Sequence, residues 1–180
     1  LAFILLFRTF MTVSMTTSLP IFMNLKGATL WLAGAALSIM ESAGVIGALS
    51  IGAISDRIGR RSVLLFSAIA SPIFIIIFLN TSGWLLIPVL LGVGFTSLSV
   101  GPVFLALIQD HFPKHRASAN GAYMLLAFLT RFPATILVGF LGDKFGLENA
   151  FLWSALLAFL VIPSIFMLPK ESKKAKESLV

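Results

Sequence analysis

The sequence has 180 residues, of which 58% are hydrophobic and 11% charged, with a mean hydropathy of +1.03 and a formal net charge of +6. Soluble domains carry about 25% charged residues, and a chain of this length cannot enclose so much apolar surface. Because there is no cysteine, a disulfide framework and a thiolate metal site are excluded. The two histidines, His111 and His115, have no acidic cluster beside them, and no hydrolase, metalloprotease or P-loop motif occurs. We therefore expect no metal, no cofactor and no enzymatic activity.

Six apolar segments follow one another along the chain. A helix that crosses a hydrocarbon core of about 30 Å needs about 20 mainly apolar residues. We expect such helices at about 1–23, 30–54, 62–79, 84–109, 118–141 and 149–168, with brief polar loops between them and a basic tail at 169–180. Pro102, Pro133 and Pro163 are expected to kink three of these helices. The predicted class is an all-α membrane protein with six transmembrane helices.

The lysines and arginines of the loops predict the orientation in the membrane, because they are enriched on the cytoplasmic side. One side carries only Lys26 and Lys144. The other carries nine basic residues, in the 55–61 loop, the 110–117 loop and the tail: Arg57, Arg60, Arg61, Lys114, Arg116, Lys170, Lys173, Lys174 and Lys176. We therefore expect these two loops and the tail in the cytoplasm of a bacterial or archaeal cell, with the protein in the inner membrane. The positive charge then faces anionic lipid headgroups, and nucleic acid is not an expected partner.

A motif rich in glycine and arginine follows the second apolar segment. It reads Gly52-Ala-Ile-Ser-Asp56-Arg57-Ile-Gly59-Arg60-Arg61. The glycines permit close helix approach and a tight turn, and the Asp56 carboxylate can pair with an arginine or accept from a helix start. This motif resembles the signature loop of the major facilitator superfamily, G-x-x-x-D-R-x-G-R-[RK], between the second and third helices of a six-helix half. The resemblance implies a latch that closes the cytoplasmic side in one state. The alternative is a loop that only fixes topology.

A second copy of the motif follows the fifth apolar segment. Gly139, Asp143, Lys144 and Gly146 repeat the G-x-x-x-D-[RK]-x-G spacing, 87 residues after the first copy (139 − 52). The second and fifth helices would then be equivalent in two three-helix units of opposite topology. An inverted 3+3 repeat is the arrangement of major facilitator halves, so the resemblance implies half of a 12-helix fold.

Two further stretches resemble efflux members of the superfamily. The segment from Arg8 to Pro20 resembles the seventh helix of fosmidomycin-resistance-type proteins, and Arg116 to Met124 resembles the entry to the fifth helix of a half in drug-efflux members. The chain also begins inside an apolar run and ends in lysines. We expect it to be the C-terminal six-helix half of a longer protein.

Three charged residues lie inside predicted spans: Arg8, Glu41 and Arg131. A charge at the centre of a bilayer costs roughly 2.5–3.5 kcal/mol on insertion scales, so it faces a cavity or a partner. We hypothesise that the arginines hold an anionic or polar substrate group and that Glu41 couples transport to protons. The alternative is a static ion pair between Glu41 and one arginine. Thr12 and Thr16 follow Arg8 at helical spacing and can line the same cavity or bond their own i−4 carbonyls.

The leading functional hypothesis is proton-coupled efflux of a drug-like or anionic compound by alternating access, with the lipid bilayer, the substrate, protons and the missing N-terminal half as partners. A half-size transporter that works as a homodimer is a second possibility. A non-transporting membrane scaffold is the third, and it would have no need of a switchable charge latch.

Overall fold

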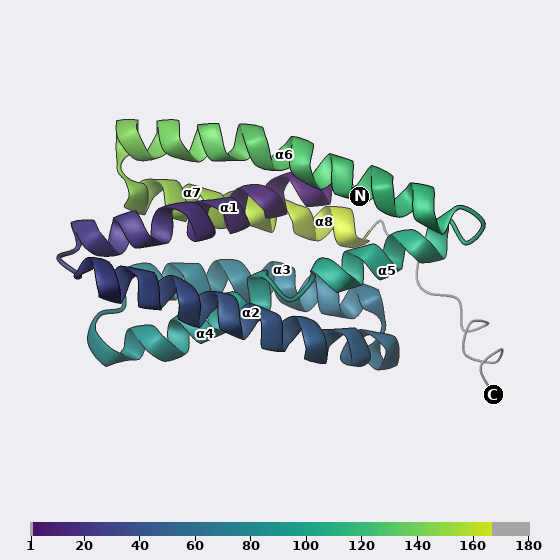
Figure 1. Cartoon of the computed structure of the whole chain (residues 1–180), viewed down its shortest axis with the longest axis horizontal. Helices are drawn as coiled ribbons and strands as arrows, with labels where there is room; N and C mark the ends of the chain where they lie inside the picture. The colour runs from purple at the N-terminus through teal and green to yellow at the C-terminus, as the bar shows by residue number, and fades with distance from the viewer. Residues whose placement is uncertain (1, 167–180) are drawn as a thin grey trace.

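The structure, a computed structural model, describes residues 2–166 as a bundle of helices with both halves of the sequence side by side (Figure 1). The tail predicted at 169–180, and the last residues of the sixth predicted helix, lie outside the described residues. The helices are α1 (Ala2–Leu25), α2 (Leu30–Ile58), α3 (Arg60–Leu79), η1 (Gly83–Leu85), α4 (Leu86–Ser97), α5 (Gly101–His111), α6 (Arg116–Phe145), α7 (Leu147–Phe159) and α8 (Val161–Phe166).

The described residues contain six helical stretches that are long and apolar enough to span a membrane, which confirms the predicted class. Several helices run further than hydropathy predicts: α2 ends at Ile58 and α6 at Phe145. Asp56 and Asp143, which the sequence analysis placed in loops, belong to the last helical turns. Hydropathy marks where the chain leaves lipid, whereas these helices end only where a glycine with positive φ turns the backbone.

Two of the six spans are interrupted near a proline. The fourth breaks between Ser97 and Gly101, just before Pro102, and the sixth breaks at Leu160, before Pro163. A proline inside a helix lacks the N–H for the i−4 bond, and its ring clashes with that carbonyl, which favours an interruption at both places. In contrast, α6 continues as a helix through Pro133.

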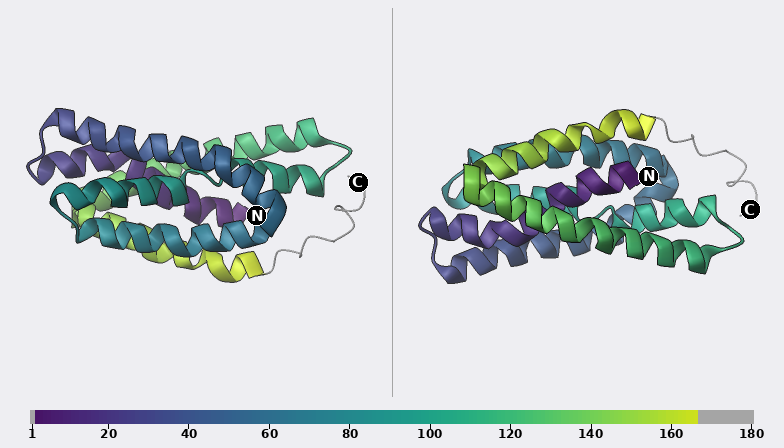
Figure 2. Two further views of the ribbon diagram at one scale, coloured as in Figure 1. Left: turned by 90° about the horizontal axis from the view of Figure 1, so that it is seen from below. Right: turned by 90° about the horizontal axis from the view of Figure 1, so that it is seen from above.

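The packing of the helices shows the inverted repeat. α2 packs against α4 as α1 packs against α6, and α3 packs against α4 as α7 packs against α1. Exchanging the first three spans for the last three leaves this pattern unchanged. In Figure 1, α1, α2, α5 and α6 lie toward the viewer. Figure 2 places α3, α7 and α8 together on the opposite side. We call the first four the front layer.

The two ends of the bundle each collect one set of turns (Figure 1). The Gly59 turn, the loop at 112–115 and the end of α8 lie at one end, here called the Gly59 end. The loops at 26–29 and 80–82 and the turn at Gly146 lie at the other, here called the Gly146 end. This is the grouping that six antiparallel spans require.

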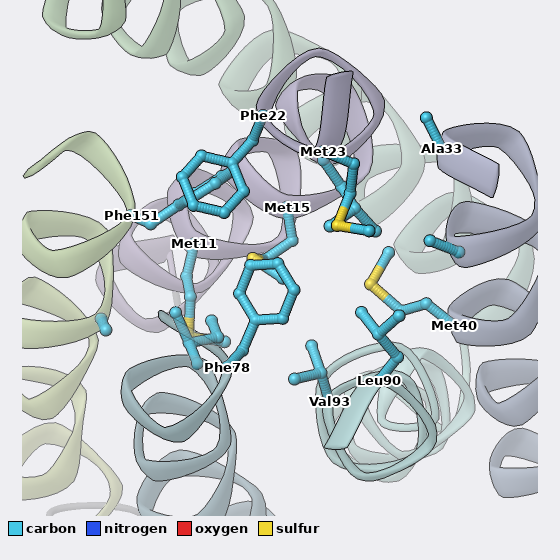
Figure 3. Packing of buried hydrophobic residues seen from close by; sticks show 14 of the residues in the cluster. Met11, Met15, Phe22, Met23, Ala33, Met40, Phe78, Leu90, Val93 and Phe151 are labelled. Atoms are coloured by element: carbon cyan, nitrogen blue, oxygen red, sulfur yellow. The ribbon is translucent and has the colours of Figure 1, made fainter. Parts of the chain in front are cut away.

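The largest buried cluster joins both three-helix units (Figure 3). The rings of Phe22, Phe78 and Phe151, from α1, α3 and α7, pack in tilted and edge-to-face arrangements with centroids 5.1–6.3 Å apart. Met15 and Met40 fill the space between α1, α2 and α4. Because lipid is as apolar as these side chains, the cluster stabilises the bundle through close packing and dispersion rather than through removal from water.

Glycines bring α2 and the fourth span into direct backbone contact. A Cβ on Gly94 would lie 1.9 Å from the carbonyl oxygen of Met40, and one on Gly44 or Gly47 would lie 2.5 Å or 2.7 Å from the Cβ of Leu98 or Ser99. The α4–α5 break therefore rests in a groove of α2 that only glycine leaves open. Such small residues are the usual contact in membrane helix pairs.

Candidate functional site

Both copies of the glycine motif end in the same backbone turn. Gly59 has φ 92° and ψ 137°, and Gly146 has φ 85° and ψ 149°. In each turn the glycine N–H donates to the carbonyl four residues earlier, at Ser55 and Gly142, over 2.9 Å and 3.0 Å. Residues other than glycine rarely adopt such a positive φ. The turn joins two antiparallel helices through a single residue, so it fixes where the charged residues beside it lie.

The first glycine of the motif was expected to permit close approach of another helix, but no described residue approaches it in either copy. A Cβ on Gly52 or Gly139 would meet no described atom within 4 Å. Neither glycine therefore supports close helix approach within the described chain, and both leave an open strip of backbone on α2 and α6.

Arg60 connects the first motif to the end of the fourth span. Its guanidinium donates to the Asp110 carboxylate at the end of α5 and lies 3.7 Å from a carboxylate oxygen of Asp56. The Arg60 side chain is only 16% exposed, so water screens this contact incompletely. Arg61 donates to the carbonyl of Phe166 over 2.9 Å, and Arg57 is exposed. At the Gly59 end, the motif thus ties the start of α3 to α5 and α8.

Asp110 was not among the residues that the sequence analysis selected. An acid at the Gly59 end of a span is a weak signal by itself, because any loop can carry one. Asp110 becomes informative only once the fold is known, because the fold brings the ends of the second and fourth spans together.

A second ion pair occupies the equivalent place at the Gly146 end. Lys26, just after α1, lies 3.1 Å from a carboxylate oxygen of Glu148 in the first turn of α7. Under the repeat, α7 corresponds to α3 and the first span to the fourth, so this pair joins the same kinds of helix end as Arg60–Asp110, with the charges exchanged, although the residues themselves are not at equivalent positions. Both side chains are more than half exposed, which makes this the weaker of the two contacts.

Arg8 lies inside the bundle, among α1, α3 and the break of the fourth span. Its Nη1 donates to the Ser67 hydroxyl over 2.8 Å, and its Nη2 donates to the Ser97 carbonyl. The guanidinium also lies 5.6 Å from the ring centroid of Phe104 on α5. The structure therefore does not bring Arg8 together with Glu41 or Arg131, and its donors are used within the bundle.

Glu41 and Arg131 are exposed on α2 and α6, two helices of the front layer. Neither forms an ion pair with another residue in the described part of the chain, so the static intrachain pair weighed above is not formed. At 1.5 Å per residue, Glu41 lies about 16 Å from the start of α2 and Arg131 about 21 Å from the end of α6. Both charges are thus near the middle of their spans.

The whole sequence matches a family model. Residues 1–179 match the model described as Major Facilitator Superfamily. The chain belongs to the major facilitator superfamily. No curated protein matches the chain. Members of the superfamily move small molecules across membranes, and the all-helical bundle of six spans corresponds to half of the major facilitator fold.

In this major facilitator chain the two threonines of α1 are partly buried. Neither the Thr12 nor the Thr16 hydroxyl hydrogen-bonds to a described residue, and the Thr16 Oγ1 is buried. Thr96, Thr130 and Thr135 instead bond the carbonyl four residues earlier. The Thr16 hydroxyl is therefore buried without a partner among the described residues, whereas the hydroxyls of Thr96, Thr130 and Thr135 are used by their own helices.

Proposed function

We propose that this chain is the C-terminal six-helix half of a proton-coupled transporter that exports a small drug-like or anionic compound by alternating access. The observation that carries the proposal is the place of Glu41 and Arg131. Each is a charged side chain near the middle of a spanning helix, exposed and without a partner among the described residues. Such a charge is costly in lipid, and it is tolerated where the helix faces a water-filled cavity or a second protein unit.

The two residues have complementary roles in this proposal. Arg131 binds the anionic or polar group of the substrate, because a guanidinium presents several donors to an acceptor pair. Glu41 carries the proton. In this proposal both side chains face the same cavity, so an anionic substrate held by Arg131 and a proton carried by Glu41 influence each other through their charges.

The partner of the front layer is a second six-helix unit. Four glycines with open space beyond their backbone lie at repeated positions on α2 and α6, again 87 residues apart (121 − 34 and 139 − 52): Gly34, Gly52, Gly121 and Gly139. The two glycines on the same helix are 18 residues apart (52 − 34 and 139 − 121), which is five helical turns. They therefore lie on the same side of that helix. The unit that packs there is the N-terminal half in the leading proposal, and a second copy of this chain in the homodimer alternative.

The contacts of Arg60 act as the latch of the proposed transporter. They tie α3 to α5 at the Gly59 end, which the distribution of basic loop residues assigns to the cytoplasm. In this proposal α5 moves away from α3 when this end opens, so the contacts favour the closed state.

The experiment is a proton-flux assay on the full-length protein in liposomes that hold a pH-sensitive dye. A panel of small phosphonates, carboxylates and hydrophobic amines is added, and a responding compound is then followed with an imposed pH gradient. We expect Glu41→Gln to abolish proton-driven accumulation while leaving exchange of the compound. Glu148→Gln, which removes an exposed carboxylate at the Gly146 end, is the control. Full proton-driven transport by Glu41→Gln would overturn the coupling role.

A further inference from the structure

The break in the fourth span leaves two backbone carbonyls without the partners that a continuous helix would supply. In such a helix the carbonyls of Thr96 and Ser97 would accept from the N–H groups of Val100 and Gly101. Here they accept from side chains of other helices: the Ser67 hydroxyl donates to Thr96, and the Arg8 guanidinium donates to Ser97. An unsatisfied carbonyl in the membrane interior costs several kcal/mol, so these two donors stabilise the interruption.

The donors also connect three helices at one place. Arg8 and Ser67 hydrogen-bond to each other, and Arg8 lies beside the Phe104 ring of α5. On the opposite side, Gly44 and Gly47 of α2 leave room for Leu98 and Ser99 of the break. The interruption is thus held from α1 and α3 and cradled by α2, while α4 and α5 extend from it in opposite directions (Figure 1).

The helix beyond the break ends at the latch. α5 carries Asp110, the partner of Arg60, in its last turn, together with Gln109, whose amide donates to Asn120 of α6 over 3.2 Å. Any change of angle at the break therefore moves Asp110 relative to Arg60. The break and the latch are the two ends of one short helix.

We propose that Arg8 is a positioning residue that holds the α4–α5 break as a pivot, so that α5 swings as a lever with Asp110 at its tip when the Gly59 end opens. This proposal rests on the transport function proposed above, but it assigns Arg8 a role through the backbone of Ser97 instead of through the substrate. Lysine at position 8 would keep the positive charge and a single donor group. Methionine would keep a long side chain but neither the charge nor a donor.

The test measures distances between spin labels and needs no substrate, so it can fail or succeed independently of the transport proposal. The sequence contains no cysteine, and labels can be attached at introduced ones. One pair, His111→Cys with Asn80→Cys, spans from the tip of α5 to the far end of α3. The reference pair, Ser62→Cys with Asn80→Cys, lies on α3 alone. Both are recorded in the full-length protein in lipid nanodiscs.

We expect Arg8→Met to broaden the 111–80 distance distribution or add a second population, with the 62–80 distribution unchanged and Arg8→Lys intermediate. An unchanged 111–80 distribution would overturn the proposal. Equal broadening of both pairs would also overturn it, because it would show general loosening of the bundle.

A second variant covers the case in which Arg8→Met does not fold. Pro102→Ala restores an N–H at an exposed position and permits a continuous helix, so it is expected to narrow the 111–80 distribution. A 111–80 distribution in Pro102→Ala as wide as in the parent protein would contradict a pivot at the break. Where transport is measurable, the Arg8 variants should lower the maximal rate more than the apparent affinity.

Discussion

Gly59 and Gly146 adopt nearly the same backbone conformation, with φ values of 92° and 85°, although they lie at opposite ends of the bundle. Each joins two long helices through a single residue, and each follows the same spacing of glycine and aspartate. The two turns are therefore structural equivalents in an inverted repeat, and a disturbance of either should have the same physical cause.

The first prediction concerns these turns. In Gly59→Ala or Gly146→Ala a Cβ is forced to a positive φ with extended ψ, which is almost restricted to glycine and costs roughly 1–3 kcal/mol, so each variant should unfold at a lower temperature in detergent. The matched control is Gly101→Ala, away from the proposed partner face, where a Cβ meets no described atom within 4 Å and φ is not positive. A control as unstable as the turn variants would contradict the explanation.

The second prediction concerns the contact of α2 with α4. Gly94→Ala would place a Cβ 1.9 Å from the Met40 carbonyl oxygen, which is backbone and cannot rotate away. The helices must separate, and overpacking of this kind costs about 1–3 kcal/mol. Gly101→Ala, on the same span but with open space around it, should change thermal stability little. An unaltered midpoint for Gly94→Ala would show that the helices do not approach as described.

The third prediction concerns the two ion pairs. The coupling energy between Arg60 and Asp110, measured by a double-mutant cycle on thermal stability, should be about 1 kcal/mol, at the upper end for such pairs. Lys26 and Glu148 are more exposed and should couple by a few tenths of a kcal/mol.

The dependence of the coupling energy on salt concentration distinguishes the two ion pairs further. Raising the ionic strength should remove the Lys26–Glu148 coupling first, because exposed charges are screened more effectively. A larger or more salt-resistant coupling at Lys26–Glu148 than at Arg60–Asp110 would contradict the difference in burial.

The fourth prediction concerns substrate binding by Arg131. If its guanidinium binds an anionic group, Arg131→Gln should raise the apparent KM for a transported anion about tenfold or more, since hydrogen bonds to charged groups contribute about 1.5–3 kcal/mol. The apparent KM of Arg131→Lys should lie between those of the parent protein and Arg131→Gln, because lysine keeps the charge but lacks the planar fork of donors. Phe132→Leu, on the neighbouring and 72% exposed side chain, is the control. An unchanged KM in Arg131→Gln would exclude the contact.

Much of the fold follows from the sequence, because the six apolar segments and the two glycine motifs are local patterns. The six spans and the order of the turns between them needed no knowledge of neighbours, whereas the break before Pro102 did, because α6 continues through Pro133. The helix ends were less accessible: Asp56 is polar yet helical, because the backbone turns only at Gly59.

The candidate site was predictable only in part. Sequence reasoning selected Glu41 and Arg131 because charges in apolar segments are rare, and their role stays a prediction. It grouped Arg8 with them for the same reason, but the direction of the Arg8 side chain depends on the carbonyl of Ser97, which a break 89 residues away makes available. Asp110 was missed because its partner lies 50 residues earlier. Contacts between distant segments leave no periodic signal in one sequence.

The central claim is that the faces of α2 and α6 that carry Glu41 and Arg131 line a water-filled cavity. The most direct measurement is the labelling of introduced cysteines by a membrane-impermeant thiol reagent, with the full-length protein in liposomes. We predict that cysteine at position 41 or 131 reacts, and that cysteine at Ile46 or Ile136, exposed positions on other sides of the same helices, does not. Absence of reaction at 41 and 131, or equal reaction at all four positions, would contradict the claim.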